Sequence, residues 1–264
     1  MRTGPYRQDG FRLRFEWGLP GAEEIAEQSW VMAVVDVLSF TTTLTVAVER
    51  GIEVFPYRWK DESAARFAQQ HDAVLAVGRS QARPGEVSLS PATVREARDV
   101  RRLVLPSPNG STIAQSMAGV AGEVIGVSLR NATAAAAWTA ARLRSDEACG
   151  VAVVAAGEQW SNGALRPAVE DLWGAGAYLS ALRRHGFDAL SPEAQSAVAA
   201  FAHVSGDIAR QLHAAASGRE LAADGYRQDV DVAAEIDRSA VVPVLVGGSF
   251  RAAALVASDR NSRS

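Results

Sequence analysis

The feature that most constrains the fold is the alternation of short, apolar, β-branched runs with alanine-rich segments of helical character. The strand-like runs are nearly all apolar, as expected for strands that are covered on both faces. Strands that alternate with helices in this way predict a mostly parallel sheet between two helical layers. We therefore expect an α/β protein of the three-layer α/β/α class, folded as a single domain over residues 1–264.

Eight runs are strand candidates. An early run at 11–17 (FRLRFEW) alternates apolar and polar residues and is predicted to be an edge strand. The other predicted strands are 31–36, 52–56, 73–77, 102–105, 123–127, 151–155 and 241–246. Helices are expected between them, at 41–50, 62–70, 111–118 and 131–143.

The last third of the chain has a different character. A long helical region begins at about 169, and we expect a helical elaboration over 190–236 that is a candidate homodimer face. Breaks in it are predicted at Gly186, Ser191-Pro192, Gly206 and Gly218. The stretch 78–91 is the longest loop candidate, and residues 258–264 are predicted to be a frayed tail.

The composition excludes several kinds of partner and location. The net charge is -3 and there is no basic stripe, so nucleic acid is not expected as the main partner. The N-terminus lacks the apolar stretch of a signal peptide, and no run of about 18 apolar residues predicts a membrane span. The cytoplasm is therefore the expected location. Cys149 is the single cysteine, which excludes an internal disulfide and leaves no cysteine–histidine pattern for zinc.

Polar turns follow several of the apolar strands, at the edge where open parallel sheets bind ligands. Asp36 ends the run VMAVVD, and a carboxylate there is costly to bury without a partner. The hydroxyls of Thr41 and Thr42 can cap the next helix, whose N-terminal amides favour an anion. The alternative is that Asp36 serves only as a helix cap.

The second turn, PSPNGST, contains Asn109, Gly110 and Ser111. Asn-Gly permits a turn with positive φ, and the backbone amides of such a turn suit phosphate. The segments VVDVLSFTTT and VLPSPNGST both run from strand through polar loop to helix start, which hints at an internal duplication. Taken alone, the turn is equally consistent with an ordinary strand–helix connection.

Two further turns complete the predicted site. Asn131 follows the run EVIGV and can cap the next helix or contact substrate. A glycine-bearing loop leads through Arg166 to the adjacent acids Glu170 and Asp171. Hard carboxylate oxygens suit Mg²⁺, so Asp36, Glu170 and Asp171 are the candidate metal ligands and catalytic groups. Arg166 is a candidate bidentate clamp for a small anionic, phosphorylated substrate.

Taken together, these segments resemble the 2-phosphosulfolactate phosphatase family. The resemblance covers roughly residues 30–246 and is carried by VVDVLSFTTTL, LPSPNGST, SLRNA, AAGEQWSNGALRPAVEDLWGAGA and SGRELAADGYRQDVDVAAEID. It implies a Mg²⁺-dependent phosphatase acting on a phosphorylated, sulfonated three-carbon acid in coenzyme M biosynthesis. The family pattern falls on Asp36, Asn109, Gly110, Ser111, Asn131, Glu170 and Asp171, and also on Ser217, Gly218, Arg219, Asp229 and Asp237.

The sequence departs from that family pattern at three places. Serine stands at 39, where the family usually has arginine, Gly174 stands where cysteine is common, and Ser88-Leu89 replaces a glycine–asparagine pair. The changes at Ser39 and Leu89 support an alternative reading, a small-anion-binding or regulatory protein that has lost catalysis on the same fold.

Other classes fit less well. Haloacid-dehalogenase phosphatases need a second acid two residues after the first, and Leu38 stands there. A nucleotide-binding domain would need a glycine fingerprint or a Walker lysine, and Lys60 is the sole lysine. For a phosphatase, the sequence leaves open whether a carboxylate attacks phosphorus or activates water.

Overall fold

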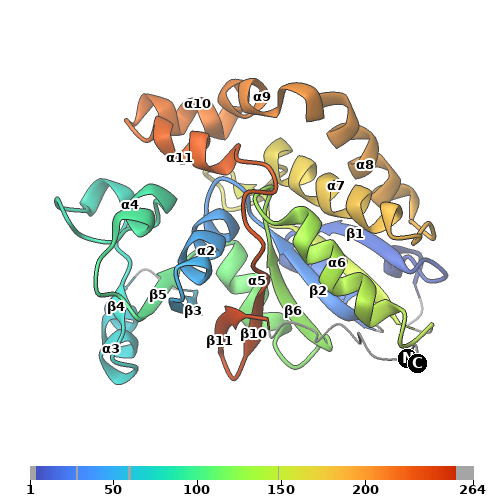
Figure 1. The fold of residues 1–264 in the computed structure, drawn as a ribbon, viewed down its shortest axis with the longest axis horizontal. Helices are drawn as coiled ribbons and strands as arrows, with labels where there is room; N and C mark the ends of the chain where they lie inside the picture. The colour runs from blue at the N-terminus through green and yellow to red at the C-terminus, as the bar shows by residue number, and fades with distance from the viewer. Residues whose placement is uncertain (1–3, 28, 59–60, 148, 254–264) are drawn as a thin grey trace, which may run out of the picture.

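A computed structural model describes residues 4–27, 29–58, 61–147 and 149–253. Within these residues, one nine-stranded sheet has the order β1-β7-β2-β6-β10-β11-β3-β5-β4 (Figure 1). Its strands are β1 (Leu13–Trp17), β2 (Ser29–Val35), β3 (Glu53–Tyr57), β4 (Val74–Leu75), β5 (Arg102–Pro106), β6 (Glu123–Val127), β7 (Gly150–Ala155), β10 (Pro243–Val246) and β11 (Ser249–Ala252). A separate two-stranded ribbon pairs β8 (Glu158–Gln159) with β9 (Leu165–Arg166).

The large sheet consists of two parallel halves joined by an antiparallel hairpin. Strands β1, β7, β2 and β6 form one parallel half, and β3, β5 and β4 form the other. Hairpin β10–β11 lies between them, with Val244 opposite Ile125 of β6 and Phe250 opposite Val54 of β3. The predicted three-layer α/β/α class with a mostly parallel sheet is confirmed, and β1 is an edge strand as expected. The central hairpin was not predicted.

Helices cover both faces of this sheet. They are α1 (Gly18–Ile25), α2 (Phe40–Glu49), α3 (Glu62–Gln70), α4 (Pro91–Glu96), α5 (Gly110–Met117), α6 (Ala132–Leu143), α7 (Val169–Arg184), α8 (Pro192–Val204), α9 (Ile208–Ala214), α10 (Ala216–Ala223) and α11 (Arg227–Ala233). Alternate residues of β2 separate the two cores, because successive side chains of a strand point to opposite faces. Val31, Ala33 and Val35 belong to the core beneath α6, α7 and α8, whereas Met32 and Val34 belong to the core with α1, α2 and α5.

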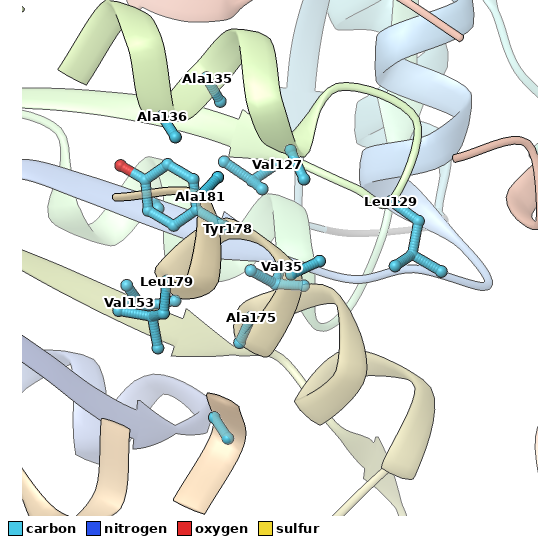
Figure 2. Close-up of a cluster of buried hydrophobic side chains, with 14 of the residues drawn as sticks. Val35, Val127, Leu129, Ala135, Ala136, Val153, Ala175, Tyr178, Leu179 and Ala181 are labelled. Atoms are coloured by element: carbon cyan, nitrogen blue, oxygen red, sulfur yellow. The ribbon is translucent and has the colours of Figure 1, made fainter. Parts of the chain in front are cut away.

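Small residues allow α7 to lie close to the sheet. Figure 2 shows Tyr178 of α7 beside Ala135 and Ala136 of α6, and the Tyr178 hydroxyl donates a hydrogen bond to Thr139 Oγ1 at 2.8 Å. A Cβ atom on Gly174 would lie 2.6 Å from the side chain of Val37. Glycine is therefore required there by close approach, despite its cost in helix propensity.

The region 190–236 is helical, as predicted, and Figure 1 shows α8 to α11 arching over one end of the sheet. The Ser191 side chain caps α8 by accepting from the Ala194 amide, and Pro192 follows at the first helical position. The expected break at Gly218 is wrong, because Gly218 lies inside α10. A Cβ there would lie 1.8 Å from the Leu212 carbonyl oxygen, so glycine permits contact between neighbouring helices instead of ending one.

The segment predicted to be a long loop folds back on itself. Val77 pairs with Ser88 as an isolated bridge, and the Leu89 amide donates to the Val77 carbonyl at 3.1 Å. A short 3-10 helix, Arg79–Gln81, lies in between, and the Ser90 side chain caps α4. This fold-back carries Arg79 toward the carboxyl end of β2.

In the described part of the chain, no helix is both long enough and apolar enough to cross a membrane. The predicted tail at 258–264 lies outside the described residues.

Candidate active site

Asp36 follows β2 and lies where two helices begin. Its Oδ2 atom accepts a hydrogen bond from the Gly110 amide at 3.1 Å and is 3.4 Å from the donating Ser107 hydroxyl. The amide of Phe40 also hydrogen-bonds the carboxylate. Phe40 and Gly110 are the first residues of α2 and α5. The carboxylate therefore lies between two helix N-termini, whose unpaired amides and dipoles favour negative charge.

Close packing explains the glycine at position 110. A Cβ atom there would lie 2.6 Å from Asp36 Oδ2 and 2.6 Å from a ring carbon of Phe40. The Asn-Gly pair permits a positive φ, but the turn does not use one: Asn109 has φ -101°, and Gly110 is not among the residues with positive φ. Any larger residue would displace Asp36 or the Phe40 ring.

Asp171 links the loop that follows β2 to the loop that follows β7. Its Oδ1 accepts from the Val37 amide at 2.7 Å, and its Oδ2 accepts from the Gly157 amide at 2.9 Å. Glu170 precedes it in the first turn of α7, and only 2% of Glu170 is exposed. Both acids of α7 are thus buried, and Asp171 bonds the residue that follows Asp36.

The carboxyl groups of this region repel one another. Burial raises the pKa of Asp36 to about 6, against the opposing effects of its amide hydrogen bonds and the Arg79 charge. Burial also raises the pKa of Asp171 well above its usual range, and the charges of Asp36 and Glu170 add to that effect. Burial, together with the same two charges, raises the pKa of Glu158 to about 7. Such a cluster of buried carboxylates is stabilised by a cation or by bound protons.

A cleft of about 380 Å³ opens beside these groups. It is lined by Leu38, Ser39, Gly78, Arg79, Ser80, Leu89, Ser107, Pro108, Asn109, Glu158, Ser217, Glu220, Leu221, Asp224 and Tyr226. Glu158 accepts a hydrogen bond from Asn109 Nδ2 at 3.2 Å, and Asn109 Oδ1 accepts from Gln159 at 3.3 Å. The predicted residue Asn109 thus faces the cleft. Glu158 was missed, although it follows the apolar strand β7 much as Asp36 follows β2.

Arg166 lies at the end of the β8–β9 ribbon, near the cleft. Its Nη2 atom donates to the Ser217 hydroxyl at 3.2 Å, and its guanidinium carbon is 5.7 Å from the ring centroid of Trp160. Its positive charge opposes the rise in the pKa of Glu158. Within the part of the chain that the structure describes, Arg166 is thus positioned by Ser217 and Trp160, and its charge acts on Glu158 beside the cleft.

The predicted hydroxyl residues shape the loops. Thr41 Oγ1 donates to the Asp36 carbonyl at 2.8 Å and accepts from the Asp36 amide at 3.0 Å. The Thr42 hydroxyl donates to the Val37 carbonyl at 2.6 Å, and the Ser111 hydroxyl to a carbonyl of β5 at 2.9 Å. All three residues are buried, and each bonds backbone groups. They hold the two helix starts in place.

Asn131 lies apart from the cleft. Its Oδ1 accepts from the Ser128 amide at 2.8 Å, and its Nδ2 donates to the carbonyls of Gly126 and Val241, both at 3.1 Å. Asp237, another residue of the family pattern, accepts from an amide in the first turn of α6 at 2.8 Å. Both residues connect the carboxyl end of β6 to the segment that leads into β10.

The predicted metal ligands are near one another without forming a closed cage. Among the residues that the structure describes, no group of three or more histidine, cysteine or acidic side chains is arranged to hold a metal ion by itself. The oxygens of Asp171 are both engaged by amides. For Asp36, the hydrogen bonds from the Ser107 hydroxyl and the Gly110 amide both reach Oδ2.

The cleft lies at the strand ends of an α/β sheet and is rich in acids, with helix N-termini and arginines around it. These features suit hydrolysis of an anionic ester. Similarity to known proteins defines the class as phosphoric monoester hydrolases. The family model described as 2-phosphosulpholactate phosphatase matches residues 20–248. The chain therefore belongs to the 2-phosphosulfolactate phosphatase family.

Two relatives show the same similarity. A probable 2-phosphosulfolactate phosphatase of Thermus thermophilus is 34% identical over 221 residues, which covers 82% of this chain and 88% of the relative. One of Deinococcus radiodurans is 31% identical over 222 residues, covering 83% of this chain and 88% of the relative.

Proposed function

We propose that the protein hydrolyses the phosphate monoester of a small acid of the 2-phosphosulfolactate type, with Mg²⁺ as its cofactor. The observation that carries this proposal is the position of Asp36, between the N-termini of α2 and α5 and beside the acids of α7. This arrangement combines amide donors for a phosphate with carboxylates for a metal or a nucleophile. A place in coenzyme M biosynthesis would follow from that substrate. The cytoplasmic location and the homodimer remain predictions from the sequence.

The donor set fits Mg²⁺ in chemistry and charge. Asp36, Glu170 and Asp171 are buried, and their mutual repulsion is relieved by a divalent cation. Mg²⁺ usually keeps several waters and binds through one or two carboxylates and the substrate phosphate, so a complete protein cage is not needed. Asp36 and Glu170 are the residues that would hold it, since both Asp171 oxygens already bond amides. When bound, the ion would neutralise developing charge on the phosphoryl oxygens.

The protein groups have separable roles in this proposal. The positive ends of the α2 and α5 dipoles, with the Asn109 side chain and Arg166, orient the phosphoryl group, while the amides of Phe40 and Gly110 hold the Asp36 carboxylate. Asp36 acts either as the nucleophile, forming an acyl phosphate, or as the base that takes a proton from water. Glu158, whose pKa of about 7 leaves it partly protonated at neutral pH, gives a proton to the leaving oxygen of the ester.

Turnover of 2-phosphosulfolactate and of p-nitrophenyl phosphate, with Mg²⁺ and after chelation, tests the proposal. Metal-dependent turnover that falls by at least about 100-fold in Asp36→Asn is expected, since removal of a catalytic group typically costs at least that much. Undiminished turnover in Asp36→Asn would remove that residue from either scheme. Rapid-quench trapping of phosphoprotein separates the two: labelled protein identifies the acyl phosphate, and its absence identifies water attack.

The same assays address a binding protein that has lost catalysis. Thermal stabilisation by 2-phosphosulfolactate without turnover of either ester would establish that alternative. The observation against it is that Asp171 of α7 and Asp36 are held by backbone amides in one place, at a cost in buried charge.

A further inference from the structure

Arg79 lines the cleft and is held there from two sides. Its Nε atom donates to Asp229 Oδ2 at 2.8 Å, and its Nη2 atom donates to the Leu38 carbonyl at 3.2 Å. Asp229 belongs to α11, is 1% exposed, and also accepts from the Ser90 hydroxyl. A buried carboxylate thus fixes one edge of the guanidinium, and the loop that follows Asp36 fixes another.

Part of this guanidinium remains open. Within the described residues, Arg79 Nη1 makes no hydrogen bond, and 16% of the side chain is exposed. A guanidinium presents its donors in a rigid fork that matches a planar or tetrahedral anion. Because Nε and Nη2 are each held by a hydrogen bond, Arg79 presents the open part of that fork in a fixed orientation, which lowers the entropic cost of binding.

Arg79 is also the single cationic side chain among the described residues that line the cleft. The other polar side chains of the outer cleft are neutral or acidic, and they include Ser80, Ser217 and Tyr226, with Glu220 and Asp224 exposed. An anionic group that enters the cleft therefore has one place to be neutralised away from the phosphate position. That place is close to Asp36, because Arg79 bonds the carbonyl only two residues further along.

We propose that Arg79 is the specificity-determining residue that binds a second acidic group of the substrate, a carboxylate or a sulfonate, while the phosphate lies at the helix starts beside Asp36. This inference rests on the proposed function and deepens it. The preferred substrate is a phosphate monoester whose carbon skeleton carries another acid a few atoms away. Esters of neutral alcohols leave the Arg79 fork unpaired and bind less tightly.

Steady-state kinetics of Arg79→Met and Arg79→Lys, with Mg²⁺, tests the proposal on 2-phosphosulfolactate and on p-nitrophenyl phosphate. Loss of a charged hydrogen bond predicts a KM for 2-phosphosulfolactate that is raised on the order of 10- to 100-fold in Arg79→Met. The KM for p-nitrophenyl phosphate should change less than about threefold, and Arg79→Lys should recover part of the loss because it keeps the charge without the fork. Arg83→Met, at an exposed position of the same loop, is the matched control and should behave as wild type.

Several results would overturn the assignment. Equal losses on both esters in Arg79→Met would show that Arg79 supports the phosphate site or the fold, and unchanged KM values would show that it contacts neither ester. If wild type turns over p-nitrophenyl phosphate alone, the proposed substrate fails, and calorimetry with 3-sulfolactate then decides the role of Arg79. Binding at least about tenfold tighter to wild type than to Arg79→Met would uphold it. Equal affinity, or no binding to either protein, would refute it.

Discussion

Asp36 Oδ2 lies 3.1 Å from the backbone nitrogen of Gly110, the first residue of α5. This contact joins the ends of β2 and β5, which belong to opposite halves of the sheet. It also brings the start of α5 to the carboxylate that follows β2. An oxygen of the first of the two similar segments is thus bound by two donors of the second, the Gly110 amide and the Ser107 hydroxyl.

Replacement of Gly110 by alanine should damage the site directly. The new Cβ would lie 2.6 Å from Asp36 Oδ2 and from the Phe40 ring, so one of them must move. We expect a loss of about 1–3 kcal/mol in the free energy of unfolding, as for other overpacked sites, and at least a tenfold loss of kcat. Urea unfolding and turnover of p-nitrophenyl phosphate measure both effects. Gly206→Ala, where a Cβ would meet nothing within 4 Å, is the control; similar losses in both variants would contradict this explanation.

Glu158 should give the metal-free protein a characteristic dependence on pH. Its folded pKa of about 7 lies above its ordinary value of 4.5, so the folded state binds the proton more tightly than the unfolded state. The resulting stabilisation is complete below pH 4.5 and is lost as the pH rises through 7.

Glu158→Gln should therefore be more stable than wild type above pH 7 and lose that advantage toward pH 4.5, since glutamine carries no charge to bury. Urea midpoints in the presence of a chelator measure the difference. Glu24→Gln, on the exposed side of α1, should show no such crossover. A stability difference for Glu158→Gln that is the same at both ends of the range would disprove the assignment.

Addition of Mg²⁺ should stabilise the folded protein, and more so at about pH 8 than at about pH 5, because carboxylate ligands must lose their protons. At roughly one hundred times the dissociation constant the gain is about 2.7 kcal/mol. Asp36→Asn should remove most of this gain, whereas Asp188→Asn, at an exposed ion pair, should keep it. Thermal unfolding over a Mg²⁺ titration is the measurement, and an equal gain in Asp36→Asn would exclude that residue as a ligand.

Asn131 should prove to be a structural residue. Its three hydrogen bonds to backbone groups join the Ser128 turn to the segment before β10. Asn131→Ala should therefore cost about 2–4 kcal/mol in the free energy of unfolding, at about 1 kcal/mol per bond plus the groups left unpaired. The KM for p-nitrophenyl phosphate should stay within about twofold. Asn162→Ala, at an exposed turn, should change neither quantity, and a large rise in KM for Asn131→Ala would restore the residue to the substrate site.

The local sequence pattern was sufficient to predict the buried strands, which form continuous apolar runs. The run EVIGV coincides with β6, and VMAVV lies within β2, because fully buried strands leave a continuous apolar signature. Hairpin β10–β11 was missed although Gly247-Gly248 joins two short runs, which is a recognised hairpin signal. Its place in the middle of the sheet depends on pairing between distant strands, which no local pattern records.

The site residues also fall into those that a local rule predicted and those that it could not predict. The rule that ligands lie at strand ends placed Asp36 near the Asn109 turn, and the structure brings the two together. The same rule suggested Asn131, which follows a strand but bonds the backbone of a neighbouring segment. Arg79 and Asp229 are 150 residues apart, so their contact depends on tertiary packing.

Hairpin β10–β11 has a consequence for biosynthesis. Among the described strands, backbone pairing between the two halves of the sheet runs through β10 and β11, so β6 and β3 each keep an unpaired edge until the ribosome has made the chain to about residue 250. Pairing between strands so far apart in the sequence slows folding and prolongs the lifetime of aggregation-prone intermediates. Nascent chains halted before Pro243 should therefore bind chaperones. They should also be inactive when released, although they contain all the residues around Asp36.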